Sequence, residues 1–499
     1  LPYPREGNLC PWRHPLFLSA FYCLNFYAHL CIIYIRLAYG GDIMNTKAKR
    51  INDFGRDHVP GLVLRVSVPF MFAQFVNVLY SIVDRIYIGN IPVTGADSLA
   101  GAGVCAPIIT LLSSFATLIG IGGSILFSMR LGQDDKKDAE RILGNCFSTL
   151  LLFSAVLTVV FLLTKGMLLR WFGASDITYP YANAYISLYL IGTLFVMISL
   201  GMNNFINAQG FGMTGMLTVS IGAVLNLILD PIFIFALHMG VRGAALATII
   251  SQGISAIWVL HFLTGKKAIL TLSLSYMKLD FRLVKEICAL GLAGFIMAIT
   301  NGSVQIVCNA TLSRYGGDLY VGIMTVINSV REIITMPVTG LTSGAQPVMS
   351  FNYGAGKHAR VKSAIKFTTI VCILFSCFMW ALLLAFPCFF IHMFNSEPEL
   401  LAEGVPAMHL YFFGIFMMSL QFAGQSTFTA LGKAKQAVFF SLLRKAIIVI
   451  PLTLWLPTVG GLGKNGVFLA EPVSNFIGGT ACFVTMIFTV WRKLDDSLK

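Results

Sequence analysis

An acidic side chain stands within a long apolar stretch near the start of the chain. Asp84 occurs in the pattern Asn77-x-x-Tyr80-x-x-x-Asp84, which places the three polar side chains on one face of a helix. A charged group inside a membrane span costs about 2.5–3.5 kcal/mol on insertion scales, so it invites a functional interpretation. The alternatives are an ion pair with the adjacent Arg85 or a position at the membrane surface.

A second acidic side chain follows an amide by one helical turn. Asp230 comes four residues after Asn226 and directly before Pro231, so the amide stacks over the carboxylate and the proline frees a backbone carbonyl. These oxygens suit a bound cation. A carboxylate in a low-dielectric cavity also binds a proton more readily, as a proton carrier requires. The alternative is a helix-ending Asp-Pro pair at the outer interface.

The elements that must position these acids are membrane helices. Hydrophobic residues make up 57% of the chain, charged residues only 11%, and the mean hydropathy is +0.79, whereas soluble domains are about 25% charged. Stretches of about 20 apolar residues can each span the bilayer. We expect spans near residues 62–89, 100–130, 142–164, 180–207, 215–237, 243–263, 284–314, 321–351, 363–386, 402–431, 437–456 and 466–491.

The two halves of the chain repeat one design. Gly132 and Gly354 are 222 residues apart (354 − 132), and the same offset joins Phe172 to Phe394, Ala208 to Ala430 and Gly210 to Gly432. A duplicated membrane bundle is typical of transporters, and six spans per copy imply a pseudo-twofold axis along the membrane normal. We therefore expect an all-α polytopic protein with twelve transmembrane helices in two six-helix lobes, at residues 44–265 and 284–499, joined by a cytoplasmic linker at 266–283.

Basic residues lie in alternate loops, as the positive-inside rule requires of cytoplasmic segments. They occur before the first span, after the second, in the linker and after the eighth, while loops 90–99 and 395–401 have none. Both termini are expected in the cytoplasm. Basic loops beside an anionic leaflet explain the net charge of +13 without a nucleic-acid partner. Residues 1–43 do not fit this plan, and we expect them to be a non-native extension upstream of a true start at Met44.

No motif for nucleotide hydrolysis or for catalysis interrupts the bundle. The sequence has no Walker A motif, no Gly-x-Ser-x-Gly and no His-x-x-x-His zinc pattern, so neither an enzyme nor an organic cofactor is expected. A secondary transporter driven by an ion gradient fits these observations. Three rivals stay open: a lipid-linked oligosaccharide flippase, a membrane-embedded transferase, and a receptor or structural membrane protein, which would not need duplicated halves with paired acids.

The motifs together resemble those of the multidrug and toxic compound extrusion (MATE) transporters, in particular their DinF and MepA-like bacterial branch. The resemblance rests on Asn226-x-x-x-Asp230-Pro231, on Gly243-Ala244-Ala245-x-Ala247-Thr248, and on Pro69 and Asp84 in the first span. It covers the chain from about Met44 onward. The fold it implies is a two-lobed V of the MATE type in the bacterial cytoplasmic membrane.

The resemblance also implies a site for the coupling ion, H⁺ or Na⁺, in the N-terminal lobe. Its residues would be Asp84, Tyr80, Asn226, Asp230 and Thr248. Pro69 matches a proline at which the first helix of family members is thought to bend, and a proline kink flexes easily because one backbone hydrogen bond is already missing. The implied activity is antiport by alternating access.

The C-terminal half departs from some family members, because its seventh span has no acid. It offers instead Glu332 beside Arg331, and Glu471 at the position that matches Thr248 (471 − 248 = 223). Arg444, followed by Lys445, lies in the eleventh span. A structural ion pair such as Arg444 with Glu471 and a role in substrate binding or gating are both compatible with this pattern.

The expected substrates are small organic cations, bound in an acidic, aromatic-lined cavity. Aromatic and Met side chains suit flat lipophilic cations. Candidate lining residues are Asn77, Met197, Met202, Asn203, Met417, Met418 and Gln421, with helix packing as the alternative for each methionine. A flippase would instead need a cavity rich in Arg and Lys. Because two lobes supply both walls of the pathway, we expect a monomer.

Overall fold

The computed structural model describes residues 52–394 and 398–496. The extension expected at residues 1–43 lies outside this part of the chain. In the described residues, ten helices are long and apolar enough to cross a membrane, and two bent pairs bring the number to twelve if each pair is one span. This count agrees with the predicted all-α, twelve-span architecture.

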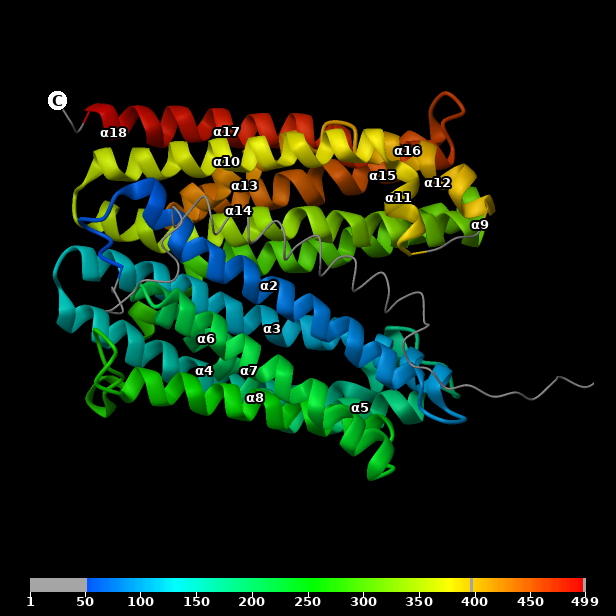
Figure 1. Ribbon diagram of the computed structural model, residues 1–499, viewed down its shortest axis with the longest axis horizontal. Helices are drawn as coiled ribbons and strands as arrows, with labels where there is room; N and C mark the ends of the chain where they lie inside the picture. The colour runs from blue at the N-terminus through cyan, green and yellow to red at the C-terminus, as the bar shows by residue number, and fades with distance from the viewer. Residues whose placement is uncertain (1–51, 395–397, 497–499) are drawn as a thin grey trace, which may run out of the picture.

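The first half of the chain forms one bundle, the N-terminal lobe, drawn in blue to green in Figure 1. Pro60 lies in the first turn of its first helix, where no backbone N–H is needed. Asp135 caps the start of α4 by accepting from the Asp138 backbone N–H at 3.0 Å. The elements of the lobe are α2 (Val59–Gly89), α3 (Gly95–Gly132), α4 (Lys136–Trp171), α5 (Tyr179–Ile191), α6 (Thr193–Ala208), α7 (Gly212–Pro231), the π-helical turn η2 (Ile232–Ala236) and α8 (Val241–Thr264).

The second half forms the C-terminal lobe, and it follows the short turn η3 (Leu274–Tyr276). Its first element, α9 (Phe281–Gly354), is two spans that meet at Gly317, whose φ of 73° suits glycine. The remaining elements are α10 (His358–Ala385), α11 (Pro387–His392), α12 (Pro398–Tyr411), α13 (Phe416–Ala430), α14 (Ala434–Leu442), η4 (Leu443–Val449), α15 (Ile450–Trp455), η5 (Leu456–Thr458), α16 (Lys464–Ser474), η6 (Asn475–Gly479), α17 (Thr480–Met486), η7 (Ile487–Trp491) and α18 (Arg492–Asp496).

One span in each lobe is broken by a bend that the sequence analysis did not predict. The fourth span bends by 57° between α5 and α6, and the tenth bends by 48° between α12 and α13. Gly192 lies at the first bend and Gly414, with φ of 74°, at the second. These glycines are 222 residues apart (414 − 192), so the duplication reproduces the bend as well as the helices.

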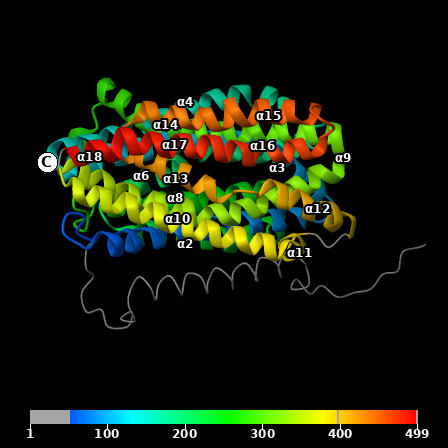
Figure 2. The same ribbon diagram turned by 90° about the horizontal axis from the view of Figure 1, so that it is seen from above.

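The two lobes meet closely at the end of the bundle that carries the α3–α4 loop, and their helices diverge toward the other end (Figure 1). At the close end, the Asn352 amide donates to the Phe54 carbonyl at 2.9 Å, and the Ser67 hydroxyl donates to the Leu341 carbonyl at 3.1 Å. In the perpendicular view of Figure 2 the long helices still run along the same axis. The lobes are thus joined mainly through one end.

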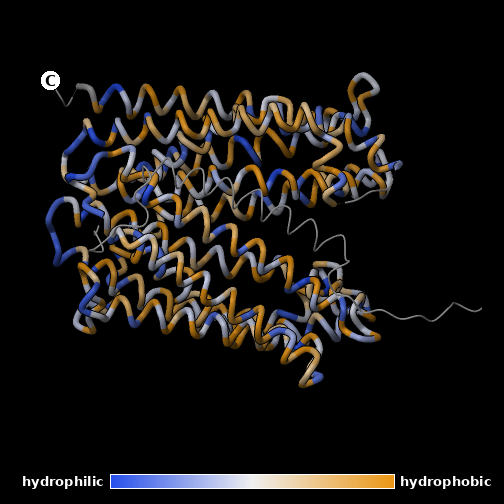
Figure 3. The backbone as a smooth tube through the Cα atoms, in the orientation of Figure 1, coloured by the Kyte–Doolittle hydropathy of each residue, from blue (hydrophilic) through white to orange (hydrophobic). Residues whose placement is uncertain are grey.

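Apolar side chains cover the outside of the bundle as well as its core. Figure 3 shows hydrophobic residues along the length of the helices and hydrophilic residues gathered in the loops at their ends. Leu163 and Ile306 are 82% and 65% exposed. Exposed apolar surface on this scale is expected of helices that face lipid.

Candidate functional site

The two acids singled out in the sequence lie together. Asp230 on α7 is fully buried, and its carboxyl group lies close enough to that of Asp84 on α2 for the two groups to interact electrostatically. Two carboxyl groups can share a hydrogen bond only if one of them carries a proton, because a carboxylate only accepts. Among the described residues no ion pair joins Asp84 to Arg85, which is exposed. Arg85 still acts on Asp84 electrostatically, so the pairing alternative stays open.

An amide and a hydroxyl connect the acids to the neighbouring helix. The Asn226 amide donates to the Asp230 carboxyl group at 3.3 Å and lies 3.3 Å from the Thr248 hydroxyl on α8. That hydroxyl donates to the Ala244 carbonyl at 3.0 Å. The i, i+4 spacing of Asn226 and Asp230 produces this contact, as their positions predict. Asn226 and Thr248 thus connect Asp230 on α7 to α8.

A cavity of about 320 Å³ lies beside this group of residues, and its walls are mainly amides and hydroxyls. Tyr80, Asn226 and Thr248 form part of it, so the cavity reaches the shell around the acids. Within the described part of the chain, its lining residues carry no charge. Its polar lining residues are Gln74, Asn77, Tyr80, Thr117, Ser124, Ser199, Asn203, Asn204, Asn207, Thr218, Asn226, Thr248, Ser251, Gln252, Ser255, Ser343 and Gln346.

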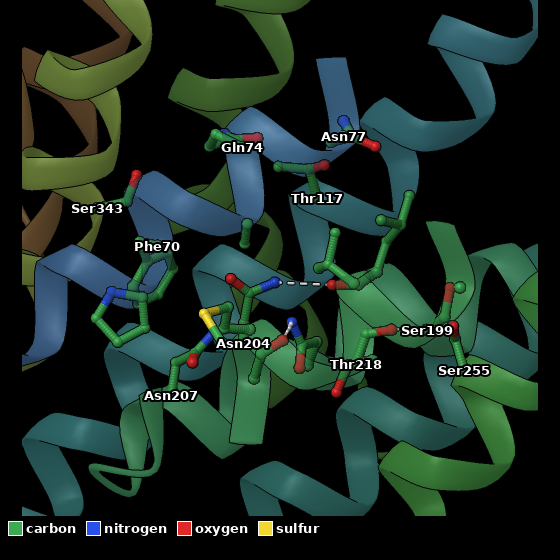
Figure 4. Close-up of a pocket in the computed structure, with 18 of the residues that line it drawn as sticks. Phe70, Gln74, Asn77, Thr117, Ser199, Asn204, Asn207, Thr218, Ser255 and Ser343 are labelled. Atoms are coloured by element: carbon green, nitrogen blue, oxygen red, sulfur yellow. Dashed lines mark hydrogen bonds between the residues drawn. The ribbon is translucent and has the colours of Figure 1, made fainter. Parts of the chain in front are cut away.

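Both lobes contribute to the cavity. In Figure 4, Ser343 of α9 lies on the opposite side of the space from Ser199 and Ser255 of the N-terminal lobe. The sequence predicted an acidic, aromatic-lined cavity, and this geometry corrects that expectation. In the described lining, Phe70 and Tyr80 are the only aromatic residues. Asp84 and Asp230 do not line the cavity themselves; their neighbours Tyr80 and Asn226 do.

Several oxygen atoms at the cavity lack a hydrogen-bond donor. The side-chain oxygens of Asn203, Asn207 and Asn226 are buried and make no hydrogen bond in the described residues. The amide nitrogen of Asn203 is engaged, because it donates to the Gly215 carbonyl at 3.2 Å. Acceptors left without donors carry partial negative charge toward a ligand that can donate or is positively charged.

Only some of the other predicted site residues line the cavity. Pro69, Asn77 and Asn203 line the cavity, and Pro69 lies inside the continuous helix α2. The remaining substrate candidates do not line it. Met197, Met202 and Met418 are buried in apolar clusters, Met417 is half-buried, and Gln421 donates to the Phe440 carbonyl at 3.3 Å. Packing between helices, the alternative interpretation, accounts for their positions.

The sequence analysis missed most of the polar lining, although a signal was present. Asn203 and Asn207 are four residues apart on α6, and Ser251 and Ser255 repeat that spacing on α8. Such polar stripes on otherwise apolar helices mark a shared, non-lipid face. Individual serines are common in membrane helices, so the stripe becomes evident only when the positions are projected on one helix.

The charged candidates of the C-terminal lobe form a buried cluster. The carboxylate of Glu471 lies 2.8 Å from the Lys445 ammonium, 3.3 Å from the Arg444 guanidinium and 4.0 Å from that of Arg331. The ion pair between Arg444 and Glu471 is thus present. Glu332 is exposed and forms no ion pair in the described part of the chain.

The sequence profile of the family described as MatE matches residues 69–232 and 294–455, which is 326 of the 499 residues (164 + 162). The chain belongs to the MatE family. This membership confirms the predicted MATE-type transporter and replaces the membrane-transferase alternative. The two matched segments fall one in each lobe.

The MatE chain is similar over most of its length to bacterial proteins and to solved structures of its family. It is 26% identical, over 86% of its length and 92% of theirs, to the multidrug export protein MepA of Staphylococcus haemolyticus. It is 26% identical, over 89% and 98%, to the probable multidrug resistance protein YpnP of Bacillus subtilis. A multidrug resistance MATE family transporter in an outward-facing conformation matches with a TM-score of 0.83 at 19% identity, covering 90% of this chain and 100% of that one. The predicted two-lobed MATE fold is confirmed.

Proposed function

We propose that this MatE transporter exports small organic cations in exchange for H⁺ entering the cell, by alternating access. The observation that carries the proposal is the proximity of the carboxyl groups of Asp84 and Asp230 beside the cavity. Two neighbouring carboxylates in a low-dielectric site repel each other, so a proton bound by the pair would stabilise this arrangement. H⁺ is therefore the preferred coupling ion, with Na⁺ as the alternative.

The cavity suits a cation of moderate size. Its volume of about 320 Å³ is that of a small drug site, and the unpartnered oxygens of Asn203, Asn207 and Asn226 lie in its wall, where their partial negative charge favours a positively charged ligand. Phe70 and Tyr80 offer aromatic surface. The names of the relatives, a multidrug export protein and a probable multidrug resistance protein, support this choice of substrate.

Exchange follows from competition between proton and substrate. Loss of the proton from the Asp84–Asp230 pair leaves two negative charges that attract a cation, and rebinding of the proton removes that attraction. Asn226 and Thr248 pass the change to α8. Pro69 provides a position at which α2 can bend, because its missing N–H leaves one helical hydrogen bond unmade.

The oligosaccharide-flippase alternative is less favoured, because it needs Arg or Lys in the cavity and the described lining has neither. We further propose that the lobes work as a monomer in the bacterial cytoplasmic membrane. The lobe contacts lie at the end with the basic loops, such as Lys136 and Lys357. The positive-inside rule then puts this end, and both termini, in the cytoplasm.

Ethidium efflux from drug-sensitive bacteria tests the proposal. We expect wild type to remove the dye, a protonophore to stop removal, and Asp84→Asn and Asp230→Asn to abolish it at unchanged protein level. Asp176→Asn is the matched control, because that carboxylate lies on a loop and its side chain is 93% exposed. Efflux that persists with the protonophore but requires external Na⁺ would assign Na⁺ instead. Efflux unaffected in both variants would reject the acid pair as the coupling site.

A further inference from the structure

The C-terminal lobe gathers three cations around one buried carboxylate, that of Glu471, while Glu332, beside Arg331, is exposed. Arg444, Lys445 and Glu471 are 5%, 2% and 4% exposed, and Arg331 adds a third cation 4.0 Å from the same carboxylate oxygen. Two guanidinium groups, which stay protonated in proteins, exceed one carboxylate even without the lysine. Unbalanced charge in a membrane span is costly, so a compensating anion is expected nearby.

Two of the cations have donors without acceptors. Arg331 makes no hydrogen bond within residues 52–394 and 398–496, and the buried Nε of Arg444 has no partner in that part of the chain. Nη1 of Arg444 donates both to the Glu471 carboxylate at 3.3 Å and to the Asn475 side-chain oxygen at 2.7 Å. Arg444 and Lys445 lie on the π-helical turn η4 and Asn475 begins η6. Such turns occur frequently at functional sites.

A small cavity adjoins this cluster. It has a volume of about 10 Å³ and is lined by Arg331 and by the amides of Asn301, Gln305 and Asn328. These amides, like Arg331, make no hydrogen bonds to the rest of the described chain. Glu471 also borders the space, but its charge is already engaged by Lys445 at 2.8 Å. The cavity has room for about one water-sized particle.

We propose that this cavity binds a small monovalent anion of the size of chloride, held by the Arg331 guanidinium and the three amides. Arg331 and the three amides border the same space, Arg444 and Lys445 add buried positive charge around Glu471, and the volume of about 10 Å³ excludes a larger oxyanion such as gluconate. The N-terminal lobe has the opposite charge character, because its site contains two carboxyl groups and side-chain oxygens without hydrogen-bond partners. The inference is independent of the proposed proton coupling, since it concerns binding in the other lobe.

Chloride titration of the purified full chain tests the site. The protein, in neutral detergent, is moved from sodium gluconate to sodium chloride at constant ionic strength, while the thermal unfolding midpoint and the line width of the chloride-35 magnetic resonance signal are followed. We expect a saturable rise of the midpoint and excess line broadening in wild type. Arg331→Gln should weaken apparent chloride affinity about tenfold or more. Arg314→Gln, an exposed arginine on the same element, is the matched control.

Glu471→Gln should change the chloride affinity in the opposite direction to Arg331→Gln. Removing the carboxylate makes the cluster more positive and should tighten chloride binding about tenfold, whereas a purely structural ion pair predicts no gain in affinity. If Arg331→Gln does not fold, Asn328→Leu removes a donor from the same cavity without changing charge. Equal responses to chloride and gluconate, or unchanged affinity in both Arg331→Gln and Glu471→Gln, would overturn the proposal. Dye efflux that still depends on Asp84 and Asp230 would leave the proposed antiport standing in that case.

Discussion

Gly132 and Gly354, which occupy equivalent positions in the two halves, pack against each other's helix. A Cβ atom at Gly132 would collide with the carbonyl oxygen of Phe351, and one at Gly354 would collide with the carbonyl oxygen of Met129. Phe351 and Met129 are themselves 222 residues apart (351 − 129). The contact is therefore reciprocal about the pseudo-twofold relation, and it holds the lobes together at their close end.

Gly354→Ala should weaken this closed arrangement. The added methyl group meets backbone rather than a flexible side chain, so we expect a cost of about 1–3 kcal/mol and a fall in the efflux rate of about tenfold. Gly103→Ala is the control, because that helical glycine has open space around it. The efflux rate and the thermal unfolding midpoint of both variants check this. An unchanged Gly354→Ala protein would show that the contact adds nothing to function or stability.

Thr248→Val should slow efflux while leaving the fold intact. The substitution keeps the shape but removes the hydroxyl next to the Asn226 amide, and a lost hydrogen bond of about 1 kcal/mol corresponds to about a fivefold slower rate. Thr264→Val controls for the hydroxyl itself, since Thr264 makes the same bond to a carbonyl four residues earlier but is exposed. Efflux assays at matched protein levels decide between them, and equal rates would remove Thr248 from the coupling path.

Asn203→Leu should raise the ethidium concentration needed for half-maximal efflux about tenfold, because it replaces an unpartnered oxygen in the cavity with an apolar group. Asn465→Leu, at an exposed position in the first turn of α16, provides the comparison. Dose-dependent efflux curves measure the effect. Curves that coincide for Asn203→Leu and wild type would argue that the substrate does not reach this part of the cavity.

Glu471→Gln should destabilise the protein by about 3–5 kcal/mol when chloride is absent, because three buried cations lose their carboxylate. Glu403→Gln should shift the unfolding midpoint little. Its carboxylate pairs with Lys464 at 3.2 Å, where both side chains are substantially exposed. Thermal unfolding in gluconate compares the two, and similar shifts would contradict the importance given to burial.

The architecture was largely predictable because it depends on local, repeated patterns. Long apolar stretches and the 222-residue repeat led to twelve spans in two lobes. The bends at Gly192 and Gly414 could have been found by the same comparison, because the two glycines keep the 222-residue offset. They were missed because glycine is common in membrane helices and the sequence does not reveal the backbone angle φ. The π-helical turns were not predictable, because they result from packing against neighbouring helices.

The site was predictable where neighbouring positions on one helix create the contact. Asn226 and Asp230 meet through i, i+4 spacing. The approach of Asp84 to Asp230 depends instead on how α2 packs against α7, which no spacing reveals. The methionine candidates do not line the cavity for a related reason: a hydrophobic residue type does not distinguish a cavity wall from an interface between helices. Met202, for example, is buried in an apolar cluster between helices.

The opposite polarity of the two lobes gives a design rule for an inhibitor. A molecule that carries a cationic group for the cavity beside Asp84 and Asp230 and, on its other end, an anionic group small enough for the space beside Arg331 would bridge the lobes. Each lobe would recognise one end, and the bridging scaffold would resist their relative motion. Such a zwitterion would gain affinity from both ends, whereas an ordinary cationic dye uses only one.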